Sequence, residues 1–167
     1  MKKFLFIAIT IVTSTLWISC NDDEGYEDYD NFEAVTKDFN GDWFIIGYFP
    51  DGSIAYGGGY VLYTTSNTAA NDENFWIDDH GAFFEIKTTV QADLDDLVFS
   101  GPENAPELIT GGTVTVSNGK IIKNGGRGSA TGTVVDSIYF EAEFDWDPGT
   151  VYQFGGHKRS GFLEDEH

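Results

Sequence analysis

The sequence predicts an all-β protein, a single antiparallel up-and-down barrel of about eight strands. Three observations lead to this fold class. Hydrophobic residues make up 41% and aromatic residues 16% of the 167 residues, which is enough for a substantial core. From residue 37 onward, apolar and polar residues alternate with the period of two that is typical of strands. Turn residues, many of them glycine, separate these segments at short intervals, which favours hairpins over helical crossovers.

The charge of the chain is strongly negative. Asp and Glu number 28 against 9 Lys and Arg, which gives a net charge of −19. A nucleic-acid-binding protein needs a basic surface for phosphates, so this class of partner is excluded. No cofactor or metal site is expected, because Asp145 and Asp147 run into Pro148 and Gly149 without the later ligands of a calcium loop. The oligomeric state is left open.

The amino-terminal residues 1–19 are predicted to be a secretory signal peptide. Two lysines precede an apolar run, Phe4 to Trp17, that is too short to span a membrane. Cys20 follows directly and is the only cysteine, so no intramolecular disulfide can form. Its position resembles a lipobox, and we expect lipidation of Cys20 in preference to a free thiol.

Residues 20–36 are predicted to be a disordered tether between the lipidated cysteine and a barrel domain at 37–167. The stretch from Asn21 to Asp30 carries a block of acidic residues with no apolar period. An acidic cluster after a lipidated cysteine resembles the signal that sends some Gram-negative lipoproteins to the outer surface. We therefore expect an outer-membrane lipoprotein exposed at the cell surface, with a simple solvated spacer as the alternative.

The first two strands are expected at residues 41–49 and 54–65. Both faces of the first strand are apolar, and Pro50 to Ser53 forms a turn. Three glycines, residues 57–59, interrupt the second strand and favour a corner or bulge over a ligand-contact site.

The middle of the chain is expected to form strands at 75–80 and 82–92, a short one at 97–99, and one from residue 113. The pairs Asn118-Gly119 and Asn124-Gly125 predict hairpin turns, because Asn-Gly is the preferred type I′ turn. Residues 138–146 give the clearest alternation, with apolar residues on one face and Tyr139 and three acids on the other. Residues 151–154 and 158–162 are expected to complete the sheet.

The segment around Trp43 is predicted to close one end of the barrel. Gly41, Asp42 and Trp43 open the first strand, so the indole can plug the barrel where glycine allows a tight bend. Because a closed barrel pairs its first strand with its last, Arg159 is expected to stack on this indole. Gly-x-Trp followed by a late arginine resembles the lipocalin, or calycin, signature.

The interior of a barrel of about eight strands is either filled by side chains or shared with one small ligand. Gly47 and Thr88 fall at inward positions and are expected to leave volume, which favours a modest apolar cavity over a solid core. The residues expected to line it are Ile45, Phe84, Ile86, Phe140, Phe144 and Trp146.

Acid–base chemistry could come only from the run Asp78-Asp79-His80 together with His157. Neighbouring residues on a strand face opposite ways, so the two aspartates would line one site only across a bulge. A general base also needs a partner within about 3 Å, and spacing does not place His157 near either carboxylate. The sequence therefore favours a non-catalytic protein over an enzyme.

Several segments resemble a family of Gram-negative lipoproteins described as lipid-binding putative hydrolases. They are Trp76 to Asp79, Gly119-Lys120, Asp136 to Ile138, Asp147 to Tyr152, and the terminal Gly156 to Phe162. The resemblance covers about residues 38–162 and implies a lipocalin-like fold and a small hydrophobic ligand. The hydrolase in the family's name transfers no catalytic set to this chain.

The leading hypothesis is a surface lipoprotein that binds a small, lipid-like ligand in its barrel. One alternative is a non-catalytic interaction module, in which an exposed Tyr48, Tyr56 or Tyr139 would engage a partner or glycan. The other is a hydrolase acting on an ester or lipid, which requires His157 within reach of a carboxylate in a cleft.

Overall fold

The computed structural model describes residues 33–167. The expected signal peptide, Cys20 and most of the expected tether lie outside the described residues. Thr36, at the end of the expected tether, is fully buried in a turn whose backbone bonds join it to Phe39 and Asn40.

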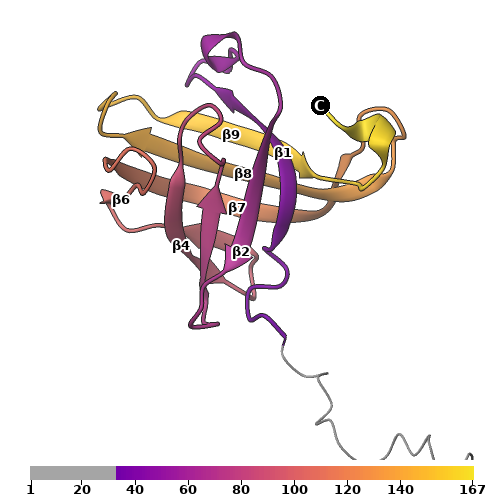
Figure 1. Cartoon of the computed structure of the whole chain (residues 1–167), viewed down its shortest axis with the longest axis horizontal. Helices are drawn as coiled ribbons and strands as arrows, with labels where there is room; N and C mark the ends of the chain where they lie inside the picture. Colours follow the sequence, from indigo (N-terminus) through magenta and orange to yellow (C-terminus); the bar gives the residue numbers. More distant parts are fainter. Residues whose placement is uncertain (1–32) are drawn as a thin grey trace, which may run out of the picture. The chain divides into compact units, whose positions relative to one another are not determined.

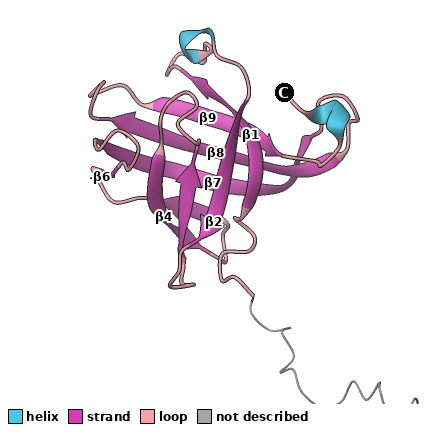
Figure 2. Ribbon diagram, in the orientation of Figure 1, coloured by secondary structure: helices cyan, strands magenta, loops and turns pink. Residues whose placement is uncertain are grey.

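Nine strands form one antiparallel sheet within residues 33–167 (Figures 1 and 2). The strands are β1 (Gly41–Tyr48), β2 (Val61–Asn67), β3 (Asn74–Asp78), β4 (Lys87–Asp93), β5 (Val98–Ser100), β6 (Ala105–Pro106), β7 (Thr113–Arg127), β8 (Val134–Phe144) and β9 (Tyr152–Lys158). Two 3₁₀ turns, η1 (Ala55–Gly57) and η2 (Leu163–Asp165), are the helical elements described.

The sheet closes on itself. β1 pairs with both β2 and β9, and β5 pairs with β7, so eight strands form a ring while the short β6 pairs with the start of β7. Apart from β6, each strand joins the next along the chain, as expected for an up-and-down meander. The predicted fold class is confirmed.

Alternation places the core inside the ring. On β8, Ile138, Phe140, Ala142 and Phe144 are buried, whereas Tyr139, Glu141 and Glu143 are only partly covered on the outer face. This separation removes large apolar surfaces from water, which contributes roughly 25 cal/mol for each Å² buried.

Two Asn-Gly pairs do not form the hairpin turns that the sequence predicts. β7 runs through both, and its register against β8 shifts between Ser117 and Lys120 and between Ile122 and Gly126. Asn118 and Asn124 have φ values of 51° and 56°. A β-bulge, like a type I′ turn, accepts a left-handed residue, so the same dipeptide suits both.

Two segments expected as strands are loops. Residues 54–60 contain η1 and only a single bridge from Ile54 to Tyr48, and β4 begins at Lys87 instead of Ala82. Glu85 has a φ of 55°, which breaks the extended conformation just before β4. Both loops lie at the end of the barrel where β1, β3 and β8 finish.

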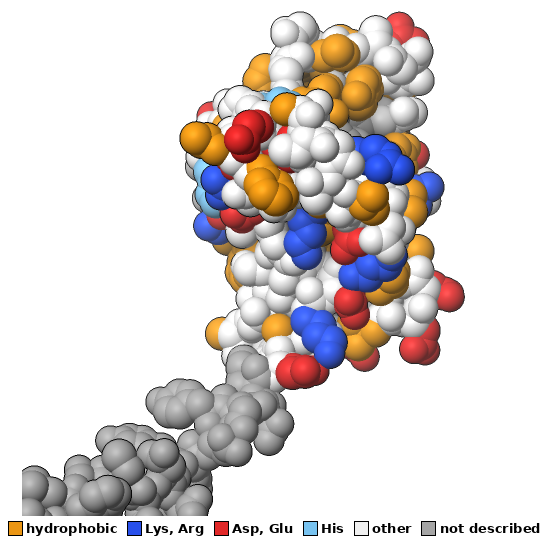
Figure 3. Space-filling model, turned by 90° about the vertical axis from the view of Figure 1, so that its right-hand side faces the viewer, with side chains coloured by type: hydrophobic (Ala, Val, Ile, Leu, Met, Phe, Trp, Pro, Cys, Tyr) orange, Lys and Arg blue, Asp and Glu red, His pale blue; other side chains and the backbone are white. Residues whose placement is uncertain are grey.

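No helix among residues 33–167 has the length and apolar character needed to cross a membrane. The face shown in Figure 3 carries acidic and basic side chains interspersed with apolar ones, with no continuous basic stripe.

Candidate ligand-binding site

The Trp43 end of the barrel is closed by hydrogen bonds and packing. The indole is fully buried, and its Nε1–H donates to Thr65 Oγ1 at 2.8 Å. The same hydroxyl donates to the carbonyl oxygen of Phe39 at 2.6 Å, so it links the segment before β1 to β2. Phe39 is also fully buried and closes this end beside the indole.

The cation over the indole is Lys158, not Arg159. Lys158 Nζ lies 5.3 Å from the centre of the Trp43 ring and donates to the carbonyl oxygen of Asn40 at 3.0 Å. Trp43 and Lys158 are register partners, so their side chains share a face, and the next residue faces the other way. Arg159 accordingly pairs outside the barrel with Glu166 at 2.7 Å.

Five of the six predicted lining residues are buried inside the barrel: Ile45, Phe84, Ile86, Phe140 and Phe144. Trp146 lies at the open end instead, and half of its surface is exposed. It still contacts the interior, because its ring stacks on Phe144 at a centroid distance of 5.0 Å.

Aromatic rings run without a break through the interior. The centroids of Phe39 and Phe99 are 6.2 Å apart, as are those of Phe99 and Phe140. Phe140 stacks on Phe154 at 4.7 Å, and Phe154 meets Phe84 edge-on at 4.8 Å. We call this series, from Phe39 to Phe84, the aromatic column.

The volume expected beside Gly47 is occupied. A Cβ on Gly47 would lie 2.5 Å from Cε2 of Phe84 and 3.4 Å from Cε1 of Phe154. The missing side chain therefore makes room for Phe84, and the expectation of empty space there is wrong. Thr88 is buried as predicted, and among the described residues its hydroxyl has no hydrogen-bond partner.

The open end of the barrel is a rim of aromatic side chains. Tyr56 and Phe83 are 59% and 40% exposed and lie close to Phe84, with ring centroids 6.3 Å and 5.2 Å away. The ring centroid of Trp146 lies 6.4 Å from that of Phe84. We call Tyr56, Phe83, Phe84 and Trp146 the aromatic rim.

A depression of about 520 Å³ opens beside Phe83, Phe84 and Trp146 of the aromatic rim. Phe83, Phe84 and Trp146 supply its apolar surface, and the loop at residues 110–112 supplies its far side. Glu85 and Asp145 also line it, so the charged groups at its edge are acidic. The aromatic column therefore reaches solvent at this depression.

A chain of hydroxyl groups supports the rim. The hydroxyls of Tyr56 and Tyr152 are 2.5 Å apart, and Tyr152 donates to Asp147 Oδ2 at 2.6 Å. Burial, followed by the hydrogen bond to Asp147, raises the pKa of Tyr152 far above its usual value. Tyr152 therefore stays protonated and acts as a fixed donor.

Asp79 holds the loop that carries Phe83 and Phe84. Its buried carboxylate accepts backbone N–H groups from Gly81 and Ile86 at Oδ1, and from Phe83, Phe84 and Glu85 at Oδ2, at 2.9 to 3.2 Å. All of this acceptor capacity is used by the backbone. Asp79 therefore shapes the loop and has no free lone pair for catalysis.

Asp78 faces the outside of β3, as the alternation requires. It accepts from Lys87 Nζ at 2.6 Å and from the backbone of His80 at 2.8 Å. His80 in turn lies 2.9 Å from the hydroxyl of Thr64, which donates to Asp42. Because that hydroxyl gives its proton to Asp42, His80 must donate to it and is not placed to act as its base.

His157 lies apart from these carboxylates. Its Nδ1 is 3.3 Å from the carbonyl oxygen of Lys158, and its ring faces Phe44 and Tyr60 at 6.0 Å and 5.2 Å. Within residues 33–167, the one histidine within 4.0 Å of a carboxylate oxygen is His80. Asp78, Asp79 and His157 do not meet in one site.

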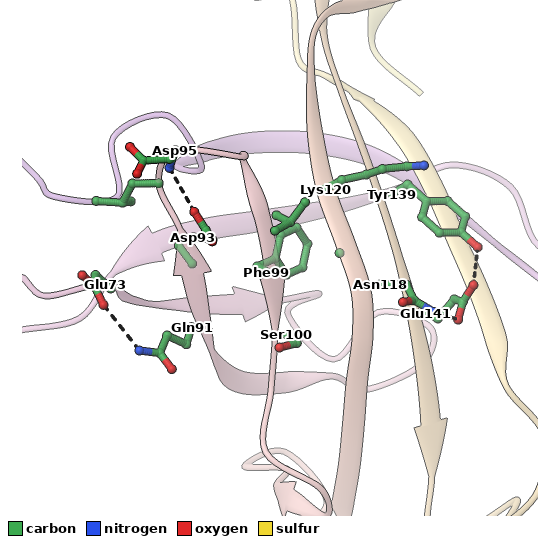
Figure 4. A pocket seen from close by; sticks show the side chains of 14 residues that line it. Glu73, Gln91, Asp93, Asp95, Phe99, Ser100, Asn118, Lys120, Tyr139 and Glu141 are labelled. Carbon is green, nitrogen blue, oxygen red and sulfur yellow. Dashed lines mark hydrogen bonds between the residues drawn. The ribbon is translucent and has the colours of Figure 1, made fainter.

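A second concavity, which sequence reasoning missed, lies on the outer face of the barrel across β4, β5, β7 and β8 (Figure 4). Its volume is about 1230 Å³. Glu73, Gln91, Asp93 and Asp95 lie on one side, and Asn118, Lys120, Tyr139 and Glu141 lie on the other. We call it the outer groove. Its residues come from four strands and from the connections beside them, so no local motif signals it.

Fold and site together define a class of protein: a small closed β-barrel of the lipocalin-like kind, with an aromatic interior that opens at one rim. A family model described as lipid-binding putative hydrolase matches residues 28–163, and the chain belongs to that family. The resemblance seen in the sequence is thereby confirmed. No curated protein matches the chain.

Proposed function

We propose that this protein is a surface-exposed lipoprotein of the outer membrane that binds a small, lipid-like ligand at the aromatic rim of its barrel. The lipid-binding family and the barrel fold support a hydrophobic ligand. The observation that carries the proposal is Trp146, which is half exposed yet stacks on the buried Phe144. Apolar surface therefore continues from solvent into the core.

The ligand binds with its apolar chain between Phe83 and Trp146. Exposed aromatic surface beside a depression is typical of binding sites, because covering it releases ordered water without a polar cost. Phe84 fills the space above Gly47 and lines the depression, so its ring forms the surface on which the chain lies at the end of the aromatic column.

The headgroup of the ligand carries no negative charge. Glu85 and Asp145 line the same depression, and the whole chain has a net charge of −19. Two carboxylates at the entrance repel an anionic headgroup and leave a neutral or zwitterionic one unaffected.

Tryptophan fluorescence tests the site. Monolaurin with a brominated acyl chain is expected to quench the protein's fluorescence through Trp146, and dodecanoate is expected to bind more weakly. Trp146→Phe should abolish most of the quenching, whereas Trp76→Phe, on the outer face of β3, should retain it. Equal quenching in both variants would place the ligand elsewhere.

The surface location rests on Cys20 and the acidic stretch after it, and needs its own experiment. Wild-type cells should incorporate radiolabelled palmitate into the protein, and external protease should remove it from intact cells. Cys20→Ala should abolish both the label and the membrane association. Protection from external protease would instead indicate an inward-facing lipoprotein.

A further inference from the structure

We propose that the outer groove is a second binding site, which takes an oligosaccharide without acidic groups. This site is separate from the aromatic rim in position and in chemistry. It goes beyond the lipid-binding function and does not depend on it.

The groove lies where the pairing of strands in the barrel wall is irregular. β5 has only three residues, and β7 bulges beside it at Asn118 and Gly119. A Cβ on Gly119 would lie 2.3 Å from the ring of Phe99, so the core ring packs directly against the bulge. Phe99 is buried and contacts Phe140, which fixes the shape of the wall from inside.

The β7–β8 side of the groove is ordered before any ligand arrives. Glu141 accepts from Asn118 Nδ2 at 2.6 Å and from the hydroxyl of Tyr139 at 2.8 Å. Lys120 Nζ lies 5.1 Å from the centre of the Tyr139 ring. Burial and the bond to Glu141 raise the pKa of Tyr139 to about 12, so its hydroxyl remains a donor. Side chains held in this way lose little conformational entropy on binding.

The opposite side offers planar polar groups. Gln91 Nε2 donates to Glu73 at 3.4 Å, and Asp93 accepts the backbone N–H of Asp95 at 3.1 Å. Carboxylates and side-chain amides can each engage two neighbouring hydroxyls. The exposed side chains of Leu94 and Val98 lie beside them and supply apolar contact.

This mixture of groups matches a sugar better than the other ligand classes. A sugar ring presents hydroxyls at its edge and C–H groups on its faces, and so uses both kinds of surface. Four carboxylates against one lysine disfavour anions, and the polar walls disfavour an acyl chain. Within residues 33–167, no three His, Cys, Asp or Glu side chains converge as they would around a metal.

The size of the groove indicates more than one sugar unit. Its volume of about 1230 Å³ exceeds the roughly 300 to 1,000 Å³ of pockets that hold a drug-sized ligand. The groove also spans four strands, which lie about 4.8 Å apart in a sheet. A short oligosaccharide can therefore lie across it.

Calorimetry with matched hexasaccharides tests the proposal on the purified protein. The probes are the gluco-, xylo- and manno-hexaoses, chitohexaose and its deacetylated form, and hexagalacturonate as the acidic comparison. At least one of the neutral or amine-bearing probes is expected to bind with a Kd below about 10 mM, and hexagalacturonate to bind more weakly than that probe. Binding by none of the neutral or amine-bearing probes, or preference for the acidic one, would overturn the proposal.

Variants locate the binding. Gln91→Ala and Tyr139→Ala should each weaken it at least about tenfold, while Tyr48→Ala, a tyrosine on the outer face of β1, should leave it unchanged. Gln91 is exposed, so its variant keeps the result interpretable if Tyr139→Ala unfolds. Trp146→Phe must not alter sugar binding, which separates this site from the aromatic rim. Equal affinity in Gln91→Ala and wild type would assign the sugar to another surface.

Discussion

Replacing Asp79 with asparagine tests whether one carboxylate holds the loop that carries Phe83 and Phe84. Five backbone N–H groups donate to its two oxygens, two at Oδ1 and three at Oδ2. Asparagine has one acceptor oxygen, so its amide group must face at least two of these donors. Each hydrogen bond to a charged group contributes about 1.5–3 kcal/mol, so Asp79→Asn is expected to lower the free energy of unfolding by about 4 kcal/mol.

The matched control is Asp78→Asn, one residue away and on the outer face. Its ion pair with Lys87 is partly exposed, so a loss of about 1 kcal/mol is expected. Urea unfolding followed by tryptophan fluorescence gives both values. Amide exchange should also quicken at Phe83, Phe84 and Glu85 in Asp79→Asn alone. If the two variants unfold at the same urea concentration with these amides still protected, the assigned role is wrong.

Three further predictions concern packing, the cation over the indole and pH. Gly47→Ala would bring a Cβ within 2.5 Å of the Phe84 ring and should lower the free energy of unfolding in urea by about 1–3 kcal/mol. Adding Phe84→Leu should reduce this loss. A Gly47→Ala variant as stable as wild type would show that the ring has room to move. Lys158→Met should cost about 1–2 kcal/mol and Arg159→Met should cost less, because the Arg159 pair with Glu166 is exposed to solvent. The reverse order in thermal unfolding would restore Arg159 as the partner of the indole. The hydroxyls of Ser160 and Thr131 lower the pKa of Asp165, so the stabilising effect of its carboxylate is present above about pH 4 and is lost as the pH falls toward the folded-state pKa. Acid titration followed by NMR should show the loop at residues 128–133 loosening over that range in the wild-type protein. The same titration behaviour in Asp165→Asn would contradict this role.

The barrel itself could be predicted from the sequence because its evidence is local. On β8, buried apolar residues from Ile138 to Phe144 alternate with Tyr139, Glu141 and Glu143, and only one face can be buried. The Asn-Gly pairs gave a wrong result for a physical reason. The left-handed conformation of Asn118 suits a turn or a bulge equally, and the choice depends on pairing with β8, far along the chain.

The site was predicted less well, because its geometry depends on register. Lys158 and Arg159 are neighbours with similar charge, and only the pairing of β9 with β1 decides which one faces Trp43. Phe84 fills the space beside Gly47, and it lies on a loop that Asp79 holds in shape. The spacing of residues along the sequence could not show that the Asp79 carboxylate accepts five backbone hydrogen bonds.

The separation of Trp43 from the aromatic rim has a consequence for how such a protein can diversify. Closure of the barrel depends on β1, β9 and the segment around Phe39, whereas its open end is shaped by the connections after β1, β3, β6 and β8. Substitutions or insertions in those connections can change which molecule binds, while the pairing of β1 with β9 that closes the barrel is kept. A library of variants randomised only in these connections should therefore yield folded proteins with altered ligand preferences.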